Sequence, residues 1–152
     1  MHAANDGSVM KKFIILAVAM IGCYLLGLSH SHHSIDDNPQ VRLVSIHDGD
    51  TITVDIVNWP PIIGHHIPIR IKGLDTPEMN DKSEKVRDLA VASKDFLESK
   101  ISTSKLQICN LERDKYFRIS ADIYADGINV GNLLLKKGFA KPYDGGKKPV
   151  WK

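Results

Sequence analysis

Residues 41–57 have the sequence VRLVSIHDGDTITVDIV, and this stretch decides the fold class. Two runs rich in β-branched residues, Val41–His47 and Thr51–Val57, flank an Asp-Gly pair at positions 48 and 49. In the second run apolar residues alternate with polar ones, which is the period of a half-buried strand. An Asp-Gly pair between two such runs is a strong signal for a tight turn. The stretch therefore predicts a β-hairpin.

A third strand is predicted downstream of this hairpin. From Ile67 three isoleucines occupy alternate positions, so Arg70 is expected on the opposite face of the strand. The intervening residues Asn58–His66, NWPPIIGHH, contain two adjacent prolines and are predicted to form a stiff loop. Trp59 is expected to pack beneath this loop.

The period changes from that of a strand to that of a helix at Ser83–Ile101. The apolar residues on one helical face are Val86, Leu89, Ala90, Phe96 and Leu97. Asp81 and Glu84 are placed as a capping box at the start. We therefore predict a long helix after the third strand.

Two further strands and a short helix are predicted in the C-terminal half. The strands are Lys105–Leu111 and Ile119–Tyr124, and the helix runs from about Ile128 to Lys137, ending at Gly138. Five short strands with a helix after the third fit a small closed barrel of the oligonucleotide-binding kind. The predicted class is mainly β (α+β): a five-stranded OB-fold-like β-barrel with a helix after strand three and a short helix after strand five.

An apolar segment precedes this domain. Lys11 and Lys12 come before the uncharged run Phe13–Leu28, which is the pattern of a secretory signal or an N-terminal anchor helix. We therefore predict a signal peptide or membrane anchor at residues 1–29, a polar linker at 30–39 and the folded domain at 40–152. Because the lysines precede the run, the domain is expected outside the cytoplasm: periplasmic, secreted, or anchored to the outer face of the cytoplasmic membrane.

Composition and charge narrow the function classes. The chain has 152 residues, of which 43% are hydrophobic, and a formal net charge of +2, as in one ordinary folded domain. Near the C-terminus only Asp144 opposes six lysines, at positions 136, 137, 141, 147, 148 and 152. Such a basic tail either attracts a phosphate backbone or is simply a solvated surface, and composition leaves both open.

Three short motifs carry residues suited to chemistry: DGDT at 48–51, DTPE at 75–78 after Arg70, and DKYFR at 114–118. Each alone has a purely structural explanation, as a hairpin turn, a helix start and a charged turn between strands. Together they supply the parts of one site.

The carboxylates of these motifs suit a divalent cation. Asp50 and Asp75 lie at the ends of strands two and three, which can pair as neighbours. Their hard oxygens, a backbone carbonyl at Thr76, and Glu78 acting directly or through water would make a site for Ca²⁺ rather than Zn²⁺.

The remaining residues suit hydrolysis of a phosphodiester. The guanidinium groups of Arg70 and Arg118 can hold a phosphate bidentately and offset the charge that develops in the transition state. Glu78 is the candidate general base for an attacking water. We therefore predict that Arg70, Glu78 and Arg118 are catalytic and that Asp50, Asp75 and Thr76 bind the metal.

The order DGDT, R-x-x-x-x-D-T-P-E, DKY-x-R and then YADG at 124–127 resembles the staphylococcal nuclease (thermonuclease) family, from about Val41 to Lys141. The resemblance implies an oligonucleotide-binding-type barrel and Ca²⁺-dependent cleavage of DNA and RNA with little base preference. It implies 5′-hydroxyl and 3′-phosphate ends and the same roles for the six residues above.

The resemblance also implies substrate contacts and shows departures. Lys115 and Tyr116 match the family's nucleotide-side residues, and Tyr143 is a loose match for its nucleotide-stacking tyrosine. Phe117 stands where the family usually has glycine, and the loop at 58–66 resembles an insertion.

Two other function classes remain open at this point. A barrel with a basic end could be a non-catalytic nucleic-acid-binding module, although such modules usually present aromatic rows on their strands. An anchored structural or interaction protein is the third alternative. On the enzyme hypothesis we expect a monomer that binds nucleic acid and contacts the membrane only through an uncleaved N-terminal segment.

Overall fold

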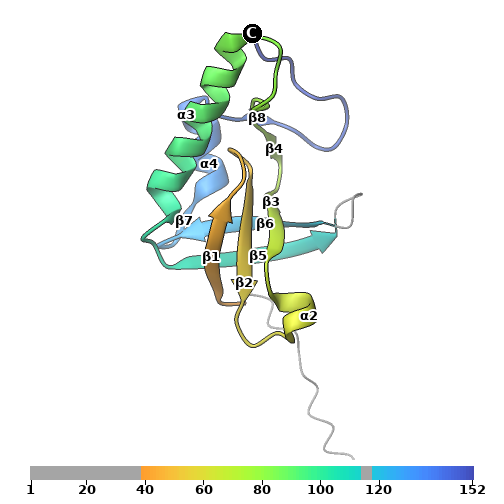
Figure 1. The fold of residues 1–152 in the computed structure, drawn as a ribbon, viewed down its shortest axis with the longest axis vertical. Coiled ribbons are helices and arrows are strands. Elements are labelled where there is room, and N and C mark those ends of the chain that lie inside the picture. Colours follow the sequence, from red (N-terminus) through yellow and green to blue (C-terminus); the bar gives the residue numbers. More distant parts are fainter. Residues whose placement is uncertain (1–38, 114–117) are drawn as a thin grey trace, which may run out of the picture. The chain divides into compact units, whose positions relative to one another are not determined.

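In the computed structural model, which describes residues 39–113 and 118–152, the predicted hairpin leads into a curled sheet (Figure 1). Its strands are β1 Val41–Ile46, β2 Thr51–Ile56, β3 Ile67–Ile71, β5 Leu106–Arg113, β6 Ile119–Ala125 and β7 Ile128–Asn129. They follow the order β1-β2-β3-β6-β5, and β7 pairs with β6. The mainly β class and all five predicted strands are confirmed.

The sheet is a curled half-barrel rather than the fully closed barrel that the sequence predicts. In the described ranges β1 and β5 are joined only through an isolated bridge between Gln40 and Gln107. The Gln40 carbonyl accepts a hydrogen bond from Val57 N at 2.9 Å, which joins the residue before β1 to the residue after β2. The two edges of the sheet are therefore linked at one bridge and not by a continuous ladder.

Alternation along the central strands determines what enters the core. Ile52, Ile69 and Ile71 are at most 1% exposed and pack in the main apolar cluster. Arg70 lies between two of these isoleucines and points to the other face, as predicted. β2 pairs antiparallel with β3, placing Thr51 opposite Arg70, so the first hairpin and third strand share one edge where polar groups gather.

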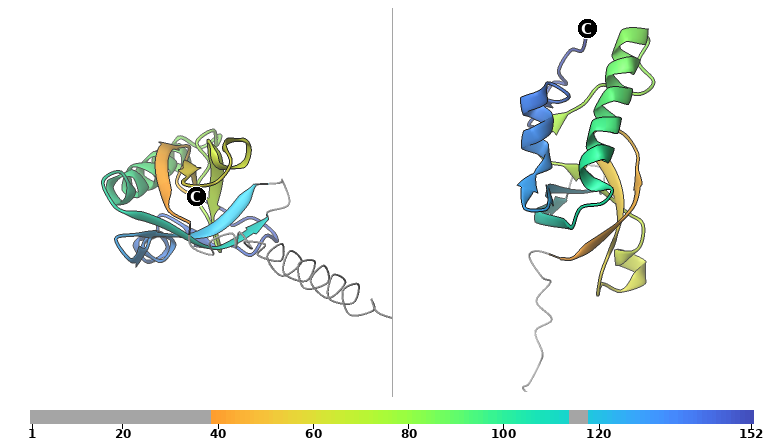
Figure 2. Two further views of the ribbon diagram at one scale, coloured as in Figure 1. Left: turned by 90° about the horizontal axis from the view of Figure 1, so that it is seen from below. Right: turned by 90° about the vertical axis from the view of Figure 1, so that its left-hand side faces the viewer.

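Two helices of the domain lie side by side (Figures 1 and 2). They are α3, Glu84–Ile101, and α4, Val130–Lys137. The predicted apolar face of α3 is confirmed in part: Val86, Ala90 and Leu97 are buried, and the other two positions are half-buried.

The start of α3 differs from the predicted capping box. The N-cap is Ser83, whose side chain makes no cap hydrogen bond. Asp81 instead accepts a bond from Ser83 N at 2.8 Å, and Arg87 donates to the Asp81 carbonyl at 2.8 Å. Asp81 therefore shapes the turn before the helix and does not cap it.

The short helix begins two residues later than predicted because residues 128–129 pair with β6 as β7. Asn129 caps it by accepting a hydrogen bond from Asn132 N at 2.9 Å. Gly138 ends it with φ +77, a conformation that favours glycine. Val130 and Leu134 are buried, while Leu133 is half-buried.

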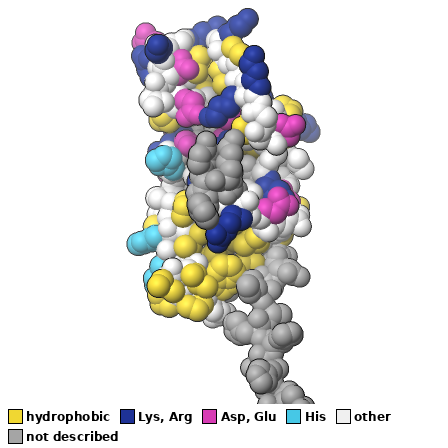
Figure 3. All heavy atoms as spheres, turned by 90° about the vertical axis from the view of Figure 1, so that its right-hand side faces the viewer, with side chains coloured by type: hydrophobic (Ala, Val, Ile, Leu, Met, Phe, Trp, Pro, Cys, Tyr) yellow, Lys and Arg dark blue, Asp and Glu magenta, His cyan; other side chains and the backbone are white. Residues whose placement is uncertain are grey.

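The proline-rich loop contains a short helix, α2, Pro61–Gly64. Asp55 fixes the loop, since its carboxylate accepts a hydrogen bond from His66 N at 3.0 Å. Trp59 packs against the core, as predicted. Ile62 and Ile63 are 91% and 51% exposed, and hydrophobic side chains gather at the lower end of the face in Figure 3.

A second, two-stranded sheet was not predicted. It pairs β4, Leu74–Asp75, with β8, Lys141–Pro142, so that Asp75 lies opposite Lys141. Gly73, with φ +75, makes the turn that separates β4 from β3. This pairing carries the chain after α4 back across the end of β3.

The predicted targeting segment at 1–29 and nearly all of the linker at 30–39 lie outside the described residues. Within residues 39–113 and 118–152, none of the helices has both the length and the apolar character needed to cross a membrane.

Candidate active site

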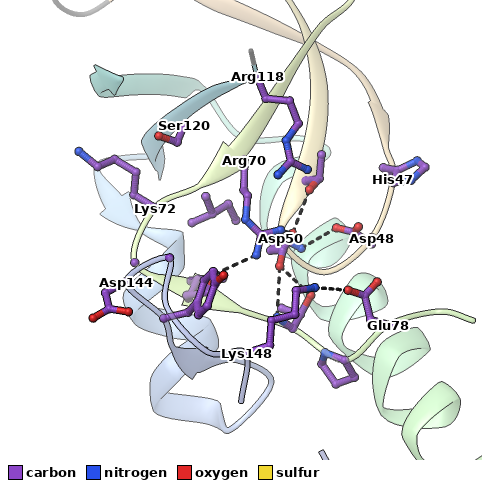
Figure 4. Close-up of a pocket in the computed structure, with 18 of the residues that line it drawn as sticks. His47, Asp48, Asp50, Arg70, Lys72, Glu78, Arg118, Ser120, Asp144 and Lys148 are labelled. Atoms are coloured by element: carbon purple, nitrogen blue, oxygen red, sulfur yellow. Dashed lines mark hydrogen bonds and ion pairs between the residues drawn. The ribbon is translucent and has the colours of Figure 1, made fainter. Parts of the chain in front are cut away.

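The ends of β2, β3 and β8 surround a cavity of about 800 Å³ (Figure 4). Among the predicted site residues, Asp50, Thr76, Glu78, Arg70, Arg118 and Tyr143 line it. The structure therefore brings together residues that are far apart in the sequence. Acidic and basic side chains both line the cavity, which gives it a mixed charge.

The turn before β2 places Asp50 at the base of this pocket. Asp50 N donates to the Asp48 carboxylate at 3.0 Å, and the Asp50 carbonyl accepts a bond from Ile71 N at 2.8 Å. Gly49 lies so close to α3 that a Cβ there would be 2.1 Å from Ser93 Oγ. The glycine of the DGD motif is therefore needed for close packing against α3.

Asp50 is only 3% exposed. Its carboxylate accepts hydrogen bonds from several neighbouring donors. Thr51 Oγ1 donates to Asp50 Oδ1 at 2.9 Å, while Thr76 donates to Oδ2 through both N and Oγ1 at 3.2 Å. These contacts orient both oxygens.

Arg70 connects the two buried aspartates. Its Nη1 lies 2.6 Å from Asp50 Oδ1, and its Nη2 lies 3.2 Å from Asp75 Oδ1. Nη2 also donates to the Leu74 carbonyl at 3.3 Å. Asp50 and Asp75 therefore lie within the span of one guanidinium, as the pairing of β2 with β3 predicts.

Burial gives Asp50 an unusual proton affinity. Desolvation is the main cause that raises its pKa from 3.8 to about 6, and the nearby Asp48 charge adds to the rise. Arg70 and the hydrogen bonds from Thr51 and Thr76 act in the opposite direction. A positive charge at this position would favour the ionised form.

Glu78 lies at the opening of the pocket on the segment after β4. Its Oε1 accepts a hydrogen bond from Lys148 Nζ, which also lies 3.5 Å from Asp75 Oδ1. The Glu78 hydrogen bond is the main cause that raises the pKa of Lys148. Figure 4 shows the Lys148 side chain directed toward Glu78, with a dashed line between the two.

The other predicted substrate residues have different outcomes. Arg118 lines the same cavity as Arg70, from the position just before β6. Tyr143 also lines it, and its N donates to the Gly73 carbonyl at 3.0 Å. Lys115 and Tyr116, like Phe117, lie outside the described residues.

Two residues of the pocket were missed by the sequence analysis. The sequence pattern predicts a turn at Asp48, although the DGD motif is also a signal for a second carboxylate. In the sequence Lys148 is one charge of the basic C-terminal end, and nothing local distinguishes it from Lys147. Its contact with Glu78 joins residues 70 positions apart.

The acidic side chains of the pocket offer oxygen ligands of the kind that a hard cation binds. No group of three or more His, Cys, Asp and Glu side chains is arranged to hold a metal in residues 39–113 and 118–152. In this arrangement the cationic groups of Arg70 and Lys148 lie against Asp50, Asp75 and Glu78. Carboxylate oxygens are the donors that Ca²⁺ prefers, so the residue types present suit that ion.

Comparison with protein families gives an independent result. Residues 68–150 match the family model described as staphylococcal nuclease homologue. The match includes β3 with Arg70, the segment with Glu78, and Lys148, while Asp50 lies before it.

Several curated proteins are similar to this chain. An uncharacterized endonuclease of Escherichia coli is 31% identical over 104 residues, covering 68% of this chain and 60% of the relative. Endonuclease YncB of Bacillus subtilis is 34% identical over 97 residues, covering 62% and 43%. Probable endonuclease LCL3 of Podospora anserina is 34% identical over 87 residues, covering 53% and 31%. The chain thus spans about a third to three fifths of these relatives.

Proposed function

The chain belongs to the staphylococcal nuclease homologue family, and on this premise we propose that it hydrolyses phosphodiester bonds in DNA and RNA. The observation that carries the proposal is that Arg70 and Arg118 line one cavity together with Asp50 and Glu78. These residues supply phosphate-binding cations, metal-binding oxygens and a base at one place. Because such groups act on the backbone, little base preference is expected.

The two arginines bind and orient the scissile phosphate. A guanidinium offers paired donors that match two phosphate oxygens, and it stays charged at all relevant pH values. Arg70 is held by Asp50 and Asp75, so its position is fixed before substrate binds. Charge that builds on the phosphate oxygens in the transition state is stabilised by both arginines.

Glu78 acts as the general base. It accepts a proton from a water molecule, whose oxygen attacks phosphorus as the bond from phosphorus to the 5′ oxygen breaks. The leaving oxygen takes up a proton, which gives a 5′-hydroxyl end and a 3′-phosphate end.

Asp50, Asp75 and the Thr76 carbonyl are the proposed ligands of Ca²⁺. When bound, the ion supplies Lewis-acid stabilisation of the phosphate charge. Asp50 and Asp75 are 3% and 1% exposed, so they are well placed to hold a cation away from bulk water.

The test is digestion of plasmid and single-stranded DNA with Ca²⁺ or with chelator. Arg70→Ala, Glu78→Gln and Arg118→Ala should each reduce cleavage by roughly two to three orders of magnitude. Lys147→Ala, a change in an exposed residue of the tail, is the matched control. A wild-type protein that retards DNA in a gel without shortening it would instead establish the non-catalytic binding module.

The product ends can be tested separately. Fragments with 5′-hydroxyl ends accept phosphate from polynucleotide kinase without prior phosphatase treatment. Fragments that need the phosphatase first would contradict the proposed direction of cleavage.

We also propose that the protein is exported. Lys11 and Lys12 ahead of the apolar run Phe13–Leu28 support this. N-terminal sequencing of the protein from cell fractions would show whether the segment is cleaved or retained as an anchor, and recovery of the intact protein in the cytoplasmic fraction would contradict export.

A further inference from the structure

The segment 143–152, here called the tail, lies against the acidic side of the pocket through Lys148. We propose that Lys148 is a positioning residue that holds the Glu78 carboxylate in its catalytic orientation. This inference rests on the proposed function, because it assigns a role relative to the general base. Its basis is the hydrogen bond from Lys148 Nζ to Glu78 Oε1, together with the ion pair to Asp75 at 3.5 Å.

The tail is attached on both sides of Lys148. Before it, Tyr143 N donates to the Gly73 carbonyl at 3.0 Å, directly after the β4–β8 pairing. After it, Trp151 Nε1 donates to Asp75 Oδ2 at 3.4 Å. Lys148 therefore extends from a segment that is fixed against the same aspartate that it contacts.

Lys141 strengthens the second attachment. Its Nζ donates to the Val150 carbonyl at 2.7 Å and lies 4.4 Å from the centre of the Trp151 ring. A cation over an indole face is a favourable contact. Since Lys141 also pairs with Asp75 across the small sheet, the tail and β4 form one connected unit.

Glu78 needs such a contact because it lies at the open side of the pocket. Its side chain is 54% exposed, and within residues 39–113 and 118–152 Lys148 is the only group that hydrogen-bonds its carboxylate. A glutamate without this bond would sample several rotamers, most of which direct the carboxylate away from the attacking water. A single rotamer keeps the Glu78 carboxylate within reach of the proton that it accepts from the attacking water.

Lys148 is also suited to remain in place during the reaction. Asp75 Oδ1 accepts contacts from both Arg70 and Lys148. When Arg70 hydrogen-bonds the phosphate of a bound substrate, Lys148 still bridges Asp75 and Glu78. The contact therefore links the proposed metal ligand to the proposed base.

The first experiment compares Lys148→Met with Lys147→Met in steady-state cleavage of a defined oligonucleotide. Methionine keeps an unbranched side chain but lacks the charge. For Lys148→Met we expect kcat to fall about tenfold or more with little change in KM, because a misplaced base slows chemistry more than binding. Lys147→Met should match the wild type, and Lys148→Arg should recover part of the loss.

The second experiment repeats Lys148→Met in a Glu78→Gln background over longer incubations. If Lys148 acts through Glu78, the double variant should cleave as slowly as Glu78→Gln alone. An equal fold-loss in both backgrounds, or an effect on KM only, would overturn the proposal in favour of direct phosphate binding by Lys148.

The outcomes separate this inference from the proposed function. Failure of the wild-type protein to cleave any nucleic acid would overturn both. Cleavage by the wild type with an unchanged kcat in folded Lys148→Met, checked by circular dichroism, would overturn only the role of Lys148.

Discussion

Arg70 Nη1 lies 2.6 Å from Asp50 Oδ1, and this pair is almost entirely removed from solvent. The side chains are 15% and 4% exposed, in contrast to the pair of Arg42 and Asp55, where the same distance joins side chains that are 75% and 12% exposed. The two ion pairs have the same distance but differ in burial. Comparing them therefore distinguishes the effect of burial on stability from the effect of the contact itself.

Replacing Arg70 with Met should strongly destabilise the metal-free protein. The change leaves the buried Asp50 and Asp75 without their shared cation, which costs about 3–5 kcal/mol in comparable buried pairs. Arg42→Met, the control, should cost less than about 1 kcal/mol, as exposed pairs do. Urea unfolding in chelator measures both, and equal losses would show that burial does not set the strength of the Arg70 pair.

The raised pKa of Asp50 predicts a pH-dependent stability. A carboxyl group with a folded-state pKa of about 6 and an unfolded value of 3.8 binds its proton more tightly in the folded state. Its ionisation therefore destabilises the fold as pH rises through this window, by on the order of 3 kcal/mol at most.

The measurement is the unfolding free energy of wild type and Asp50→Asn between pH 4 and pH 7 in chelator. Wild type should gain stability relative to the variant as pH falls from about 7 to about 4. A difference that is constant over this range would mean that Asp50 titrates normally.

Calcium should stabilise the fold, because the proposed ligands are positioned only in the native state. At a free Ca²⁺ concentration of 100 times Kd the gain is about 2.7 kcal/mol. Asp50→Asn and Asp75→Asn should lose most of this gain, while Asp88→Asn, an exposed position on α3, should keep it. A wild-type melting temperature that is identical in Ca²⁺ and chelator would argue against a calcium site.

Gly49→Ala should weaken both the fold and cleavage. The new Cβ would lie 2.1 Å from Ser93 Oγ and 3.1 Å from Thr76 Cβ, so the turn must shift away from α3. Overpacking of this kind costs about 1–3 kcal/mol. Adding Ser93→Gly removes the two shortest contacts of the new Cβ, both of them with Ser93, and should restore part of the melting temperature and activity. Absence of any effect of Gly49→Ala would contradict the close packing of this turn against α3.

Most of the sheet could be predicted from the sequence because its strands carry a local period. The alternation in residues 51–57 and from Ile67 specifies both the strands and the face that Arg70 occupies. The long helix was predicted for the same reason, from its apolar spacing. The predicted capping box at Asp81 was wrong, since an acidic residue before a helix can form a turn as readily as a cap.

The second sheet and the role of Lys148 could not be predicted in this way. β4 and β8 have two residues each, too few to show any period. Their pairing and the contact of Lys148 with Glu78 depend on where the chain returns after α4, which is a property of the whole fold. The sequence did predict that Asp50 and Asp75 lie near each other. Asp50 directly precedes β2, Asp75 follows shortly after β3, and these two strands are neighbours.

The parallel pairing of β3 with β6, which sets Arg70 beside Ser120, also bears on how the molecule folds. The first hairpin is local and can form quickly, but this pairing must wait for a loop of about fifty residues to close, and nonlocal pairings slow the folding of small proteins. The two arginines are thus separated until a late step. A refolding chain should regain early hairpin structure well before it regains any capacity to cut nucleic acid.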